Sequence, residues 1–106
     1  MQLEQAPITE KERFELELEF LESIANPMYI HYLAQNGLLD DPAFQRFLNY
    51  LQYWQKTPYV LYVEFPHALA FLKLIQVESF RQAMKRQEFA LMVYQQQGLH
   101  WQYYSE

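Results

Sequence analysis

Prolines divide this sequence into short segments, and the residues in front of two of them are those that begin helices. Asn26 precedes Pro27 and Asp41 precedes Pro42, and Asn and Asp are favoured as N-caps while proline is favoured at the first helical position. Behind each start, apolar residues recur at intervals of three and four, which is the spacing of one helix face. The sequence therefore predicts a set of short helices, and we expect an all-α fold.

Residues 14–20 are the one stretch that argues for a strand. Their sequence, FELELEF, alternates apolar and acidic residues as a half-buried strand does. The alternation ends at Leu21, whereas apolar residues at helical spacing continue to Ala25. Thr9 and Glu12 form the pattern of a capping box, which begins a helix. We therefore predict a helix over this stretch.

Glu17 falls inside the apolar arc of that helix. A buried carboxylate without a partner costs several kcal/mol, so it needs donors, or a partner that is not the core. We predict that Glu17 is at least partly buried and hydrogen-bonded to a tyrosine hydroxyl, a tryptophan or histidine N–H, or a helix N-terminus. In the alternative, Arg13 at position i−4 draws Glu17 to the rim of the bundle.

The other segments complete the expected bundle. The segment after Pro66 is apolar nearly all round, as in a helix at the middle of a bundle. We expect about four longer helices plus short helical pieces around one core, in a single domain over residues 13–105 that follows a flexible acidic segment over residues 1–12. The predicted helices cover residues 10–25, 27–36, 42–57 and 66–80, with a kink across 82–86 and a further apolar stripe that runs to Gly98.

Composition limits the classes of function. The chain has 106 residues, a net charge of −5 and no run of Lys or Arg, so it lacks the positive surface that binding to nucleic-acid phosphates requires. Its start does not have the charge pattern of a signal peptide, and no uncharged run is long enough to cross a bilayer. There is no cysteine for disulfides or thiolate chemistry. We expect a soluble intracellular protein that binds neither nucleic acid nor membrane directly.

Residues with catalytic chemistry are few and scattered. The three histidines, His31, His67 and His100, lack the Glu-x-x-His or His-x-x-x-His spacing of a metal site. The two glycines lie apart and cannot form a phosphate-binding loop. We therefore expect no enzyme activity, metal, cofactor or small-molecule substrate. A metal enzyme built from carboxylates and histidines in the bundle core is the alternative.

Aromatic residues with polar tips are in excess. Tyr53 projects opposite the apolar stripe that begins at Phe44, so on an isolated bundle it would lie on the surface. Tyr and Trp are enriched at interfaces, and aromatic-lined grooves bind extended proline-rich segments. In the alternative, each ring packs in the bundle and shows its hydroxyl to water. The residues that we predict to contact a partner polypeptide are Tyr50, Tyr53, Trp54, Tyr59, Tyr62, Trp101 and Tyr104.

Several short motifs occur in one order and spacing along most of the chain. They are Arg13-Phe14, Glu17-Leu18-Glu19-Phe20, Ala25-Asn26-Pro27, Leu33-Ala34-Gln35 with Gly37, Tyr53-Trp54, and Leu99-His100-Trp101-Gln102. Over residues 13 to 105 they resemble the family of Mediator complex subunit 31. The chain departs from the family pattern at Leu38-Leu39, where many relatives carry an aromatic pair, and at Pro58, which is displaced by one position.

The resemblance implies a partner and a location. Members of that family are small helical bundles without catalytic activity, in the middle module of the coactivator that connects activators to RNA polymerase II. They bind the N-terminal segment of Mediator subunit seven, which includes proline-rich sequence. The resemblance thus implies a nuclear scaffold subunit whose partners are subunit seven and other middle-module subunits. The alternative is a helical module that associates with itself, outside Mediator.

Overall fold

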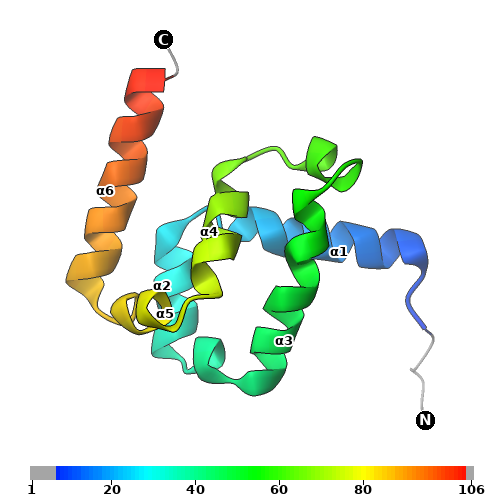
Figure 1. Ribbon diagram of the computed structural model, residues 1–106, viewed down its shortest axis with the longest axis horizontal. Coiled ribbons are helices and arrows are strands. Elements are labelled where there is room, and N and C mark those ends of the chain that lie inside the picture. Colours follow the sequence, from blue (N-terminus) through cyan, green and yellow to red (C-terminus); the bar gives the residue numbers. More distant parts are fainter. Residues whose placement is uncertain (1–6, 105–106) are drawn as a thin grey trace.

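Helices make up the regular structure of the part of the chain that the computed structural model describes, the backbone of residues 7–104 and the side chains of residues 7–97 (Figure 1). No strand occurs in this range, which confirms the predicted all-α class. The α-helices are α1 (Glu10–Ser23), α2 (Pro27–Gln35), α3 (Pro42–Tyr50), α4 (His67–Ile75), α5 (Glu78–Ala83) and α6 (Gln87–Tyr104), and the 3₁₀ turns are η2 (Leu38–Asp40), η3 (Leu51–Gln55) and η4 (Tyr59–Tyr62).

The helix starts lie where the sequence predicts them. Thr9 and Glu12 form the capping box: the Thr9 hydroxyl accepts from the Glu12 backbone N–H at 3.0 Å, and the Glu12 carboxylate accepts from the Thr9 N–H at 2.8 Å. The Asn26 and Asp41 side chains accept backbone N–H groups in the first turns of α2 and α3, at 3.0 and 2.9 Å. Because α1 begins at Glu10, it includes residues 10–12, which the sequence analysis assigns to the flexible N-terminal segment.

The predicted helix over residues 66–80 is wrong as one element, because α4 ends at Ile75 and a separate α5 follows. The Nη1 atom of Arg81 donates to the backbone oxygens of Ile75 and Gln76, each at 2.9 Å. These carbonyls lose their helical partners at the break, and the guanidinium supplies donors in their place. Arg81, which makes these two hydrogen bonds, lies beyond the break. Apolar periodicity in the residues before the break therefore does not reveal where the helix ends.

Two further boundaries differ from the prediction, and one agrees with it. The third helix leaves α geometry after Tyr50 and continues as the 3₁₀ turn η3 to Gln55. The last helix passes through Gly98 and reaches Tyr104. The break between α5 and α6 falls in the polar region 82–86, where the sequence predicts a kink.

The core lies where α4 meets α1, α5 and η3, and α6 packs against α2. Figure 1 shows that the last turns of α6 extend away from the other helices.

Two polar side chains are buried among the described residues: Glu17, and His31, whose Nδ1 lies 2.7 Å from the Met84 backbone oxygen. None of the described helices is both long and apolar enough to cross a membrane. The buried apolar side chains include Leu21, Ile24, Ile30, Leu39, Leu48, Leu51, Trp54, Phe71, Leu72, Ile75 and Met84.

Candidate partner-binding site

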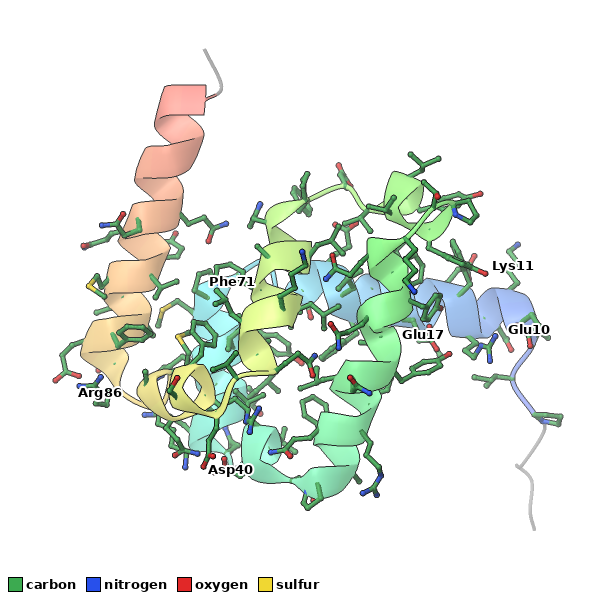
Figure 2. The ribbon with its side chains drawn as sticks, viewed as in Figure 1. Glu10, Lys11, Glu17, Asp40, Phe71 and Arg86 are labelled. Carbon is green, nitrogen blue, oxygen red and sulfur yellow. The ribbon has the colours of Figure 1, made fainter. Side chains whose placement is uncertain are left out.

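Glu17 is the centre of a polar cluster between α1 and the end of α3 (Figure 2). Its side chain lies in the apolar arc of α1, and the residue is 6% exposed. The Tyr50 hydroxyl donates to Oε2 at 2.7 Å, the Tyr53 hydroxyl donates to Oε1, and the Trp54 Nε1–H points at Oε1 from 3.4 Å. The carboxylate therefore has a donor for each oxygen, which offsets the free-energy cost of removing it from water.

The change from α to 3₁₀ geometry explains how both tyrosines reach the same carboxylate. A 3₁₀ helix has three residues per turn, so side chains at i and i+3 lie one above the other. Tyr50 and Tyr53 have this spacing across the start of η3. On a continuous α-helix Tyr53 would lie on the open surface, as predicted, whereas in the structure its ring is half-buried with its hydroxyl on Glu17.

Arg13 does not draw Glu17 to the rim. The Arg13 guanidinium pairs instead with Glu10, at 2.5 Å, and both side chains are well exposed to solvent. An exposed pair of this kind contributes little to stability. The charge of Arg13 nevertheless stands at the edge of the surface that contains Tyr50 and Tyr53, because all three residues line one groove.

That groove, here called the tyrosine groove, has a volume of about 650 Å³. The rings that line and support it meet in tilted or edge-on pairs: Phe14 lies 5.0 Å from Trp54 and 5.1 Å from Tyr62, and Tyr53 lies 4.7 Å from Tyr59, between ring centroids. Contacts of this geometry hold aromatic rings in place. The lining residues are Glu10, Lys11, Arg13, Phe14, Tyr50, Tyr53 and Tyr59.

The structure brings together five of the predicted contact residues, but they do not all lie on the surface. Tyr50, Tyr59 and Tyr62 are 44%, 37% and 58% exposed. Tyr53 is half-buried, and Trp54 is wholly buried with 0% exposure, so Trp54 supports the groove from inside the core rather than facing a partner. Tyr53 and Trp54 thus lie deeper in the molecule than their polar tips predict.

Trp101 and Tyr104, the remaining predicted residues, belong to the last turns of α6, and their side chains lie outside the described part. The α6 backbone stands on the opposite side of the molecule from the start of α1 (Figure 1). The predicted partner contacts of Trp101 and Tyr104 stay predictions.

Sequence reasoning missed the contribution of α1 to the groove. Glu10, Phe14 and Glu17 recur at intervals of four and three, which puts them on one helix face, and Lys11 follows Glu10. Figure 2 shows Glu10 and Lys11 at the N-terminal end of α1, beyond Glu17 on the same helix. This spacing can be seen in the sequence. The sequence does not show that these residues of α1 lie next to the tyrosines of a distant segment.

The hydrogen bonds to Glu17 also change how the tyrosines titrate. The Glu17 hydrogen bond, followed by burial, raises the pKa of Tyr50, and burial followed by the Glu17 hydrogen bond raises the pKa of Tyr53, both from an ordinary value of 10.0. A raised folded-state pKa gives stability that is complete below the unfolded pKa and is lost as the pH rises above it. The cluster is therefore expected to lose stability at alkaline pH.

We expect the free energy of unfolding to fall more steeply from about pH 10 to about pH 11.5 in the wild-type chain than in Tyr53→Phe, by roughly 1 kcal/mol per pH unit. Urea unfolding followed by circular dichroism at several pH values measures both slopes. Tyr32→Phe is the matched control, because Tyr32 is 57% exposed on α2. Equal slopes in the wild type and in Tyr53→Phe would contradict the assigned role of Tyr53.

Among the described residues, no group of three or more His, Asp or Glu is placed to hold a metal ion. The buried carboxylate, Glu17, is instead committed to two tyrosines and Trp54. The arrangement has chemistry suited to holding a polypeptide: fixed aromatic faces, hydroxyls and charged groups at the rim.

Comparison with known proteins identifies the family. The sequence profile of the Med31 (SOH1) family matches residues 11–105. A protein named Mediator of RNA polymerase II transcription subunit 31 from Arabidopsis thaliana is 47% identical over 94 residues, which are 89% of this chain and 48% of the plant protein. The protein of the same name from Danio rerio is 43% identical over 95 residues, which are 90% of this chain and 70% of the fish protein.

A third relative of that name, from Caenorhabditis briggsae, is 40% identical over 100 residues, which are 94% of this chain and 60% of the nematode protein. The chain thus spans less than two-thirds of the plant and nematode relatives. The similarity covers α1 to α6, and with it every described residue of the tyrosine groove except Glu10. From the profile match and these relatives, the chain belongs to the Med31 (SOH1) family.

Proposed function

We propose that this chain is a non-catalytic subunit of Mediator that acts in RNA polymerase II transcription in the nucleus. Membership of the Med31 family supports the proposal, as do the names of the relatives. We further propose that it works in the middle module with other subunits and binds the N-terminal segment of Mediator subunit seven. The tyrosine groove is the surface that we assign to this partner.

The observation that carries the assignment is the set of tyrosine rings held over Glu17. Extended proline-rich segments bind between aromatic rings, because their preformed backbone loses little entropy and their rings pack flat on aromatic faces. Tyr50 and Tyr53 are fixed through their hydroxyls, and Tyr59 contacts the Tyr53 ring edge-on. A groove whose rings are already ordered avoids much of the entropy cost of binding.

We expect calorimetric titration with the N-terminal segment of subunit seven from the same organism to show submicromolar binding. Tyr59→Ala is expected to weaken it by about tenfold or more, because that ring is exposed at 37% and lines the groove. Tyr32→Ala, at 57% exposure on α2, is the control and should bind like the wild type.

The outcomes test the identity of the partner and the choice of binding surface separately. Tight binding that Tyr59→Ala leaves unchanged would keep the partner and reject the tyrosine groove. No binding by a folded sample would reject subunit seven as the partner. Light scattering of the isolated chain tests self-association through the same rings, since a dimer that Tyr59→Ala dissociates would favour that alternative.

A further inference from the structure

A second groove lies at the other end of α1, where α1 passes into α2. Its volume is about 710 Å³, and the segment after η4 and the middle of α6 form its far side. Most of its surface is apolar or aromatic, and Glu22 is its one acidic residue. The residues that matter for its chemistry are Glu22, Pro27, Tyr29, Phe65, Tyr94 and Gln97, and we call it the Glu22 groove.

Two acceptor oxygens in this groove have no donor among the described residues. They are Oε1 of Glu22 and Oε1 of Gln97, and both atoms are buried. The other Glu22 oxygen accepts the Glu64 backbone N–H at 2.6 Å. Ser23, the neighbouring hydroxyl, donates instead to the Phe20 carbonyl. A buried carboxylate oxygen without a donor costs free energy, which a ligand with N–H groups would recover.

The groove is therefore suited to a planar cation that carries several N–H donors. The carboxylate of Glu22 favours positive charge, and each of the two unpaired oxygens can accept an N–H. The rings of Tyr29, Phe65 and Tyr94 offer surfaces on which a planar group can lie. Guanidinium meets all three conditions, since it is always charged, carries five N–H donors in a plane and stacks on aromatic rings.

We infer that the Glu22 groove binds an arginine side chain presented by a partner polypeptide. The inference does not rest on the function proposed for the tyrosine groove. Glu10 and Glu22 lie at opposite ends of α1, about 18 Å apart at the rise of an α-helix. Both grooves can therefore be occupied at once, by one long segment or by two partners.

The first test is a titration of the 106-residue chain with N-acetylarginine amide, followed by the backbone amide signals in two-dimensional NMR. We expect saturable shifts, in the millimolar range for so small a probe, that centre on Glu22, Ala25 and Tyr94. The citrulline analogue has the same shape without the charge, and the lysine analogue has the charge without the planar donors. Shifts of equal size with either analogue would overturn the assignment of arginine.

The second test uses variants of Glu22. Glu22→Gln keeps an acceptor for the Glu64 N–H but removes the charge, so it should weaken binding of the arginine probe by about tenfold or more. Glu19→Gln removes the same charge from an exposed position on α1 and should bind normally. Unchanged binding by Glu22→Gln would reject the site.

Stability distinguishes a binding role for Glu22 from a structural one. Glu22→Gln removes the charge beside an oxygen that has no donor and keeps an acceptor for the Glu64 N–H, so the urea midpoint of the free variant should stay close to that of the wild type. A lower midpoint would mean that the carboxylate serves the fold, and would overturn the inference. Tyr94→Ala, which removes an exposed ring of the groove, should weaken arginine binding in a folded chain.

Discussion

Replacing Trp54 with alanine is expected to lower the free energy of unfolding by about 3 to 5 kcal/mol. The side chain has no exposed surface, and its ring contacts Phe14, Tyr53 and Tyr59 at centroid distances of 5.0, 5.4 and 5.8 Å. Alanine would leave a large cavity under the tyrosine groove and remove the N–H that points at Glu17. Urea unfolding at neutral pH, followed by circular dichroism, measures the loss.

Two variants make this result specific to burial. Trp54→Phe retains most of the ring volume and should lose only about 1 to 2 kcal/mol. Tyr62→Ala removes a neighbouring ring that is 58% exposed and should lose less than Trp54→Ala. If Trp54→Ala lost under about 1 kcal/mol, the position of Trp54 in the core would be wrong. If Trp54→Ala shows the expected loss of about 3 to 5 kcal/mol, weaker partner binding by this variant would reflect unfolding and not a lost contact.

The second large effect is expected for Glu17→Gln, with a loss of about 2 kcal/mol or more. An amide carries one acceptor oxygen where the carboxylate has two, and its N–H₂ group would face the hydroxyl donors of Tyr50 and Tyr53. Hydrogen bonds to a charged acceptor are also stronger than those to a neutral one. The measurement is again urea unfolding at neutral pH.

Glu15→Gln is the control for charge, because Glu15 is exposed on the same helix and should change stability little. A double-mutant cycle with Tyr53→Phe tests the contact itself. Glu17→Gln and Tyr53→Phe should lose less together than the sum of their separate losses, because they remove the same hydrogen bond. Additive losses would show that the two residues act independently.

Local signals in the sequence are enough to place the helix starts and the interior position of Glu17. Capping by Thr9, Asn26 and Asp41 depends on residues within one turn, so it can be predicted from the local sequence alone. The same holds for Glu17, which follows from its angle on α1.

Features that depend on distant parts of the chain cannot be predicted from local sequence. The end of α4 depends on Arg81, which crosses the break to reach Ile75. The position of Tyr53 depends on a change to 3₁₀ geometry, which brings its hydroxyl to Glu17. Apolar periodicity assumes one continuous helix and so cannot show either. For the site, the sequence supplies a set of candidate aromatic residues but does not show which of them face outward.

The shortness of the helices has a consequence for how the molecule unfolds. Helices α2, α3 and α4 have 9 residues each, whereas an isolated helix in water needs about 12 to 15 residues to persist. Each therefore depends on contacts made across the chain, such as the contact of His31 with the Met84 carbonyl 53 residues away. Cooperative folding is therefore expected, and a cut in a loop between α1 and α4 should destabilise the helices that form both grooves.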